Sequence, residues 1–297
     1  MIFIGGKAMT IRNVTVIGAG VLGVQIALQA ARHGFDVIAQ DVSDEAVARA
    51  EGAVAQIAAQ MQADLDLPAD EMTAARARLT LTSDLAKAVE AADLIIEAVP
   101  EDPQIKRDLY ARLARLAPEG TIFATNSSTL LPSALAEATG RPARFLALHF
   151  ANRIWLHNVA EIMGHPGTDP AVRDEVTAFA RAIGMEPIVL EKEQPGYVLN
   201  SMLVPFLQSA SALWVDGVAQ PEDIDKVWRI ATGAPVGPFQ IYDVVGLNTA
   251  WHISAVGDAK AQAFAQRLKS EFLDKGKLGM SSGEGFYRYG GTDPNTR

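Results

Sequence analysis

Residues 14–41, VTVIGAGVLGVQIALQAARHGFDVIAQD, decide how this chain folds. The apolar run at 14–17 predicts a strand, and the glycine-rich turn GAGVLG at 18–23 follows it directly. Small and apolar side chains at helical spacing continue to Gly34, and a second apolar run begins at Phe35. Because a helix between two apolar strands is the repeating unit of a parallel sheet, the stretch predicts the start of an α/β domain.

The three glycines of the turn stand where a phosphate-binding turn needs them. Gly18 permits a tight turn, Gly20 lets a pyrophosphate approach the backbone, and Gly23 lets helix and strand pack closely. The helix N-terminus then offers free N–H groups and the positive end of its dipole to the phosphates. A glycine-rich turn alone is weak evidence, but the strand before it and the helix after it predict a dinucleotide-binding site.

Asp41 ends the second apolar run about 20 residues after the glycines, where the dinucleotide fingerprint has an acidic residue. Its carboxylate would accept hydrogen bonds from the ribose hydroxyls of the adenosine and would repel a 2′-phosphate. Val42, Ser43 and Asp44 supply no cation that could reverse this preference. We therefore expect NAD, rather than NADP, as the cofactor.

Composition limits the class of protein. The chain has 297 residues, of which 49% are hydrophobic and 21% charged, and this length is enough for two domains. Cysteine is absent, so no disulfide framework can form. The formal charge of −9 argues against nucleic acid and anionic membranes as partners. Without a signal peptide or a membrane-spanning apolar stretch in the sequence, we expect a cytoplasmic protein.

The pattern of strands and helices changes once along the chain. We expect further strands at 79–82, 93–99, 121–125, 144–150, 158–163 and 186–190, with helices between them at 44–62, 71–78, 103–116, 132–139 and 169–183. This alternation predicts a Rossmann-like, doubly wound sheet, although it leaves the order of the strands open. After Pro195 only helices are expected, at 198–215, 220–231, 241–255 and 259–275.

We place the domain boundary near Lys192. Residues 1–191 then form an NAD-binding Rossmann-like domain, and residues 192–297 form an all-helical domain for substrate binding and dimerisation. Long apolar helices in a domain of about 105 residues often bury their exposed stripe against a second copy, so we expect a homodimer.

His149 and Glu161 are the candidates for proton transfer. His149 closes the apolar strand FLALHF at the carboxyl edge of the sheet, where doubly wound folds bind their ligands. Glu161 interrupts the apolar strand VAEIM twelve positions later, so two adjacent short strands would set a carboxylate beside an imidazole. A single histidine at such a position is more often a core residue bonded to backbone. The pair, however, matches the general base and orienting acid that oxidation of an alcohol needs.

These motifs together resemble the L-3-hydroxyacyl-CoA dehydrogenases over nearly the whole chain, from Asn13 to Tyr289. The resemblance implies a Rossmann-like NAD domain, a helical dimerisation domain and no metal. It makes His149 the catalytic base and Glu161 the residue that orients it. It places Ser128, in the segment Asn126-Ser127-Ser128, where it bonds the substrate oxygen and the catalytic histidine.

The same resemblance assigns further residues to the substrate and the cofactor. Asn200, in GYVLN, matches the residue beside the reacting carbon. In IIEAVPEDPQIK, Glu101 and Lys106 take the positions that contact nicotinamide and its ribose, and Asn126 is assigned to cofactor binding with them. The segment GKLGMSSGEGFYRY near the C-terminus is similar to the family's closing motif.

Two departures from the family pattern concern the substrate handle. The chain has Ala151-Asn152-Arg153-Ile154-Trp155 where the family usually has Asn-Pro after His-Phe, so the loop that shapes the acyl pocket differs. The hairpin at 42–80 carries seven acids, three arginines and no lysine, which are poor partners for the phosphates of CoA. The cations left for this role are Arg76, Arg78 and Arg153, each of which could equally be an exposed solubilising charge.

The sequence therefore predicts an NAD-dependent oxidoreductase that interconverts 3-hydroxyacyl-CoA and 3-ketoacyl-CoA, a reaction of fatty acid metabolism, by hydride transfer with a His-Glu dyad. One alternative keeps the chemistry but replaces the thioester with a free hydroxy acid of the sugar acid or carnitine type. A second alternative is a catalytically idle, crystallin-like NAD-binding protein, against which the set of His149, Glu161, Ser128 and Asn200 argues.

Overall fold

A computed structural model describes residues 3–4, 7–8 and 10–289 of the chain. The chain divides into two compact units, the first ending at Val198 and the second beginning at Leu199. This division falls seven residues after the predicted boundary before Lys192, because the bends and the turn that follow the last strand pack within the first unit.

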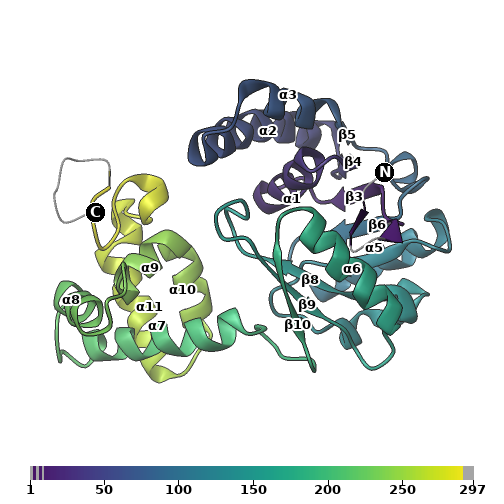
Figure 1. Cartoon of the computed structure of the whole chain (residues 1–297). Helices are drawn as coiled ribbons and strands as arrows, with labels where there is room; N and C mark the ends of the chain where they lie inside the picture. Colours follow the sequence, from purple (N-terminus) through teal and green to yellow (C-terminus); the bar gives the residue numbers. More distant parts are fainter. Residues whose placement is uncertain (1–2, 5–6, 9, 290–297) are drawn as a thin grey trace. The chain divides into compact units, whose positions relative to one another are not determined.

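The first unit is built on an eight-stranded sheet with the order β10-β9-β8-β7-β6-β3-β4-β5 (Figure 1). Its strands are β3 (Asn13–Ile17), β4 (Asp36–Gln40), β5 (Leu79–Thr82), β6 (Leu94–Glu97), β7 (Ile122–Thr125), β8 (Phe145–Phe150), β9 (Val159–Met163) and β10 (Glu186–Leu190). Every neighbouring pair is parallel except β8 and β9, which are antiparallel. Strands β9 and β10 therefore run against the other six.

Helices cover both faces of this sheet (Figure 1). They are α1 (Val21–Arg32), α2 (Asp44–Leu65), α3 (Ala69–Ala77), α4 (Leu85–Val89), α5 (Pro103–Leu116) and α6 (Pro170–Ala182). Side chains alternate along each strand, so Leu94 and Ile96 join the core under α1, α2, α3 and α6, whereas Ile95 joins the core under α4 and α5. The predicted doubly wound α/β fold is confirmed.

Steric limits explain two of the three glycines in the turn between β3 and α1. Gly18 has a φ of 98°, and a Cβ at this position would lie 2.6 Å from the carbonyl oxygen of Ala98. A Cβ at Gly23 would lie 1.8 Å from the carbonyl oxygen of Gly18, so only glycine lets α1 approach β3 this closely. At Gly20 a Cβ would meet no atom of the described residues within 4 Å.

Two helix predictions were wrong in detail. The expected helix at 132–139 consists of two 3₁₀ turns, Pro132–Ala134 and Ala136–Thr139, because the N–H groups bond three residues back. The expected helix at 241–255 is broken at Gly246, whose φ of 92° is incompatible with a continuous helix. A short antiparallel pair, β1 (Phe3–Ile4) and β2 (Lys7–Ala8), was not predicted.

The second unit is all-helical, as predicted. It comprises α7 (Leu199–Val215), α8 (Pro221–Thr232), α9 (Pro238–Val245), α10 (Leu247–Ala255) and α11 (Ala259–Glu271). Its core is aromatic: the Trp214 ring makes edge contacts with Phe239, Phe264 and Phe286.

The closing motif GEGFYRY is held in the second unit by a buried carboxylate. Asp243 accepts hydrogen bonds from the N–H groups of Phe286 and Tyr287, both at 2.9 Å, and from the Tyr289 hydroxyl at 2.8 Å. A Cβ at Gly285 would lie 2.0 Å from Asp243 Oδ1, so the motif needs glycine there.

The helices of the described residues include none with the length and hydrophobicity of a membrane-spanning segment.

Candidate active site

The dinucleotide turn, Asp41 and His149 belong to the carboxyl edge of the six parallel strands. The turn follows β3, Asp41 follows β4, and His149 is the next-to-last residue of β8. This is the edge at which doubly wound sheets bind ligands, because the strand-to-helix loops open there.

The residues present fit a dinucleotide. Gly20 is exposed at the N-terminus of α1, has no side chain to cap the helix, and leaves open the space that a Cβ would fill. Asp41 is fixed beside this turn: Oδ2 accepts a hydrogen bond from the N–H of Ala19 at 3.0 Å, and Oδ1 accepts one from Val42 at 2.7 Å. A phosphate can therefore approach the helix N-terminus while an oriented carboxylate remains for a ribose.

The antiparallel pairing of β8 and β9 brings His149 and Glu161 together. The two residues are directly opposite in the register, so their side chains leave the same face of the sheet. His149 Nδ1 lies 3.0 Å from Glu161 Oε2, and both side chains are buried. Glu161 Oε1 accepts a second hydrogen bond, from the N–H of Val198 at 2.9 Å.

Ser128 contacts the other nitrogen of the imidazole. Its Oγ lies 3.0 Å from His149 Nε2. The turn that carries Ser128 is held by Glu101, which accepts hydrogen bonds from the Ser127 hydroxyl and from both the N–H and the hydroxyl of Thr129. Burial raises the pKa of Glu101, but these hydrogen bonds and the charge of Lys106 outweigh it and lower the pKa to about 2. Glu101 is therefore ionised at every working pH.

Lys106 is 1% exposed, and its ammonium group lies between two carboxylates. Its Nζ is 2.5 Å from Glu97 Oε1 and 3.3 Å from Glu101 Oε2. Glu97 Oε2 in turn accepts hydrogen bonds from the hydroxyls of Tyr110 at 3.1 Å and Thr125 at 2.8 Å. Lys106 thus ties Glu101 to a fully buried acid at the end of β6.

Two residues in contact with the candidate site residues, Glu97 and Tyr197, were not predicted from the sequence. The signal for Glu97 was an acid within the apolar run LIIEAV, comparable to the signal that singled out Glu161. The Tyr197 ring stacks on the His149 ring, with centroids 4.4 Å apart and an angle of 13° between the planes. No spacing rule in the sequence connects Tyr197 to His149.

Asn126 and Asn200 lie in different units. Asn126 Oδ1 accepts a hydrogen bond from the N–H of Phe150 at 2.9 Å, which ties the end of β7 to the end of β8. Asn200 is the second residue of α7, in the second unit.

The loop after His149 is attached to the hairpin of α2 and α3. Arg153 Nη2 and Trp155 Nε1 each lie 2.8 Å from Asp64 Oδ2, near the end of α2. Arg153 has a φ of 57°, and its N–H donates to Gln25 Oε1 on α1 at 2.7 Å. Arg153, one of the three cations considered for a phosphate handle, is therefore already paired with an acid.

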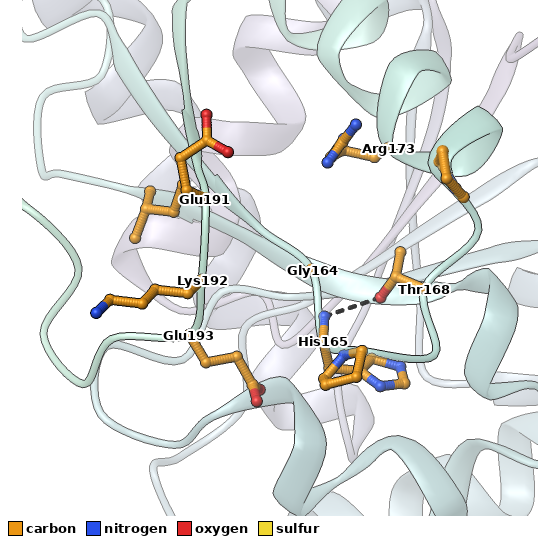
Figure 2. A pocket seen from close by; sticks show the side chains of 10 residues that line it. Gly164, His165, Thr168, Arg173, Glu191, Lys192 and Glu193 are labelled. Atoms are coloured by element: carbon orange, nitrogen blue, oxygen red, sulfur yellow. Dashed lines mark hydrogen bonds between the residues drawn. The ribbon is translucent and has the colours of Figure 1, made fainter.

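A cavity of about 380 Å³ lies on the opposite edge of the sheet (Figure 2). It is lined by the residues that follow β9 and β10, among them His165, Arg173 and Lys192. Because β9 and β10 run against the other strands, their carboxyl ends meet the edge remote from the dinucleotide turn. This cavity is separate from the candidate active site.

Among the described residues no cluster of three or more potential metal ligands is found.

Hydride transfer from an alcohol needs a dinucleotide site and a group that exchanges a proton with the hydroxyl, and the candidates for both lie at one edge of this sheet. Fold and site thus define a nicotinamide-dependent dehydrogenase. Two family models match nearly the whole chain: the NAD-binding domain of 3-hydroxyacyl-CoA dehydrogenase over residues 13–194 and its C-terminal domain over residues 196–289. The chain belongs to the 3-hydroxyacyl-CoA dehydrogenase family and is an NAD-dependent enzyme.

Similar proteins agree with this family. A probable 3-hydroxybutyryl-CoA dehydrogenase of Deinococcus radiodurans is 36% identical, over 92% of this chain and 99% of the relative. The human mitochondrial hydroxyacyl-coenzyme A dehydrogenase is 34% identical, over 95% of this chain and 93% of the relative. A solved structure of a diketoreductase, described as acting on dicarbonyl compounds, is 54% identical with a TM-score of 0.92, over 95% of this chain and 100% of that one.

Asp41→Ala is expected to narrow the preference for NADH over NADPH by about 10–100-fold, the range for hydrogen bonds to a charged group. The variant loses the ribose contact and no longer repels a 2′-phosphate. The measurement is kcat/KM with each cofactor, for wild type and variant. Wild-type enzyme that uses both cofactors equally well would contradict the role of Asp41.

Proposed function

We propose that this enzyme interconverts 3-hydroxyacyl-CoA and 3-ketoacyl-CoA, with His149 as the general base in oxidation and the general acid in reduction. The observation that carries the proposal is the hydrogen-bonded series Ser128, His149 and Glu161 at the cofactor edge of the sheet. This geometry gives an imidazole one partner that fixes its tautomer and leaves the other nitrogen for proton transfer.

The direction of proton transfer follows from the partners of the ring. An ionised Glu161 can only accept, so His149 Nδ1 carries the proton of the neutral ring and Nε2 has the free lone pair. Bound NAD supplies the hydride acceptor, and NADH the hydride donor. In oxidation Nε2 takes the proton from the hydroxyl oxygen as a hydride leaves the carbon that bears this hydroxyl, and Glu161 stabilises the imidazolium that results. In reduction the same proton passes from Nε2 to the ketone oxygen.

The remaining site residues orient the reactants. The Ser128 hydroxyl, 3.0 Å from Nε2, is placed to hydrogen-bond the reacting oxygen as well. Asn200 takes the position beside the reacting carbon of the substrate. The adenosine and pyrophosphate part of NAD is bound by Gly18, Gly20, Gly23 and Asp41. Its nicotinamide part is bound by Glu101, Lys106 and Asn126. The burial of Lys106 supports a role through Glu101, whose carboxylate it holds in place.

His149→Gln is expected to lower kcat by about 10²–10⁴-fold, the usual contribution of a positioned general base, and to leave NADH binding nearly unchanged. Glu161→Gln should lower kcat because the imidazolium loses its charged partner, and Ser128→Ala should lower it less. The matched control is His165→Gln, at the opposite edge of the sheet, which should keep wild-type kcat. A folded His149→Gln variant that binds NADH and keeps most of its turnover would refute the dyad.

A second candidate function is reduction of a free dicarbonyl compound by the same chemistry. Two observations favour it. The 54% identical structure belongs to a diketoreductase. Of the three cations considered for CoA phosphates, Arg153 pairs with Asp64 at 2.8 Å and Arg78 with Asp36 at 3.4 Å, which weakens any grip on a phosphate.

Three substrates with the same reacting carbons separate the two functions: acetoacetyl-CoA, its N-acetylcysteamine thioester, which lacks the nucleotide phosphates, and ethyl acetoacetate. We expect the highest kcat/KM with acetoacetyl-CoA and less than about a tenfold loss with the short thioester, because two of the three arginines considered for the phosphates are paired with acids. KM for acetoacetyl-CoA should change little between about 0.01 and 0.15 M ionic strength. Turnover of ethyl acetoacetate without turnover of either thioester would replace the first function by the second.

We also propose that the helical unit forms a homodimer. Val227 and Ile230, three residues apart on one face of α8, are 68% and 75% exposed, and Val244 and Ile253 add exposed apolar surface on α9 and α10. Ile230→Asp should convert a species of twice 31.7 kDa into a monomer in sedimentation velocity. Leu116→Asp, on α5 of the first unit, is the control and should stay dimeric. A monomeric wild-type protein would disprove the dimer.

A further inference from the structure

Tyr197 occupies a strained and fully buried position beside the proposed dyad. Its φ of 55° lies in the left-handed region, which a bulky residue rarely adopts, and the side chain is 1% exposed. The residue belongs to the turn between β10 and α7, where its N–H donates to the carbonyl of Gln194 at 3.0 Å. Such strain persists only where surrounding contacts impose it, so the contacts of this side chain are of functional interest.

Tyr197 and its neighbour contact both members of the dyad. The tyrosine ring lies nearly parallel to the imidazole of His149, with centroids 4.4 Å apart. The next residue, Val198, donates its N–H to Glu161 Oε1 at 2.9 Å. The hydrogen bonds to Glu161 and Ser128 lie in the plane of the imidazole and limit its movement within that plane. The stacked tyrosine ring adds a different constraint, because it limits movement of the imidazole perpendicular to the plane.

The hydroxyl group of Tyr197 acts on the serine turn. It donates a hydrogen bond of 2.7 Å to the carbonyl oxygen of Ser127, at a buried position. Ser127 is the residue before Ser128, and its own hydroxyl is bonded to Glu101. Burial raises the pKa of Tyr197 well above its ordinary value, with the charges of Glu101 and Glu161 adding to the effect, so the phenol remains a donor.

We propose that Tyr197 is a positioning residue for proton transfer: its ring holds the face of the His149 imidazole, and its hydroxyl holds the Ser127 carbonyl and thereby Ser128. Tyr197 acts through these two residues. The inference rests on the proposed function in that it assigns proton transfer to His149, whereas the stacked arrangement itself can be tested without any substrate.

Kinetics of two variants separate the two contacts. Tyr197→Phe keeps the stacked ring and loses the hydroxyl, so kcat should fall about 3–10-fold. Tyr197→Leu loses both contacts, so kcat should fall about 10–100-fold, with the phenylalanine variant restoring most of that loss. KM for NADH and for the keto substrate should stay within about two-fold of wild type, because neither is bound through Tyr197. Tyr242→Phe, in the core of the helical unit, is the matched control and should keep wild-type kcat.

A double-mutant cycle with Ser128→Ala tests the route through the serine turn. If the hydroxyl of Tyr197 acts through Ser128, Tyr197→Phe should add almost no further loss of kcat in the Ser128→Ala background. An equal loss in both backgrounds would overturn this part of the proposal. A tyrosine that merely stabilises the fold would lower the melting temperature and leave kcat of the folded variants at the wild-type value, which would overturn the whole proposal.

The stacking can also be tested by NMR, which needs no turnover. This test still applies if the leucine variant is inactive for other reasons or if the wild type turns over none of the substrates tried. A ring stacked on an imidazole shields its protons, so one histidine ring signal, assigned by its loss in His149→Gln, should lie upfield in protein labelled at histidine. It should keep this shift in Tyr197→Phe and lose it in Tyr197→Leu. A signal at the ordinary position in the wild-type protein would refute the stacking, whatever the substrate of the enzyme.

Discussion

The antiparallel pairing of β8 with β9 is the constraint on which the site depends. In an all-parallel sheet, the strand after β8 would return through a helix, and its residues would reach the same edge from a distant part of the chain. Here a short loop reverses the chain, and the register sets Glu161 opposite His149, both inside a buried sheet. Main-chain hydrogen bonds therefore place the two residues opposite each other, within reach of the hydrogen bond that joins the imidazole to the carboxylate.

Charge satisfaction explains how Glu97 can lie inside this domain. A buried carboxylate is tolerated only when hydrogen bonds and an opposite charge replace its hydration. Glu97 meets this condition with Lys106, Tyr110 and Thr125, and the exposed Glu101 shares the same lysine and holds the serine turn. Because Lys106 is shared, removing it would leave two acids without their cation. The conformation of the turn that carries Ser128 thus depends, through Glu101 and Lys106, on the ion pair with Glu97 at the end of β6.

The sequence was sufficient for those parts of the fold that depend on local pattern. The glycine turn, Asp41 and the apolar strands were predictable because each position has a steric or electrostatic reason of its own. His149 and Glu161 could be paired because two adjacent strands relate positions twelve apart. Tyr197 could not be found this way, since a turn with two left-handed residues, Gly196 and Tyr197, carries no periodic signal. Gly246 was misjudged because glycine inside an apolar helical pattern is often tolerated.

The departures from the family pattern are confined to segments that carry no part of the proton-transfer geometry. The loop 151–157 and the α2–α3 hairpin differ from the family pattern in the sequence, and the structure joins them through Asp64, which binds both Arg153 and Trp155. His149 is hydrogen-bonded to Glu161 on β9 and to Ser128 in the serine turn, and neither partner lies in these two segments. Because Asp64 joins the two segments, a substitution in one of them bears on the other, whereas the register of β8 and β9 holds His149 and Glu161 opposite each other independently of both segments.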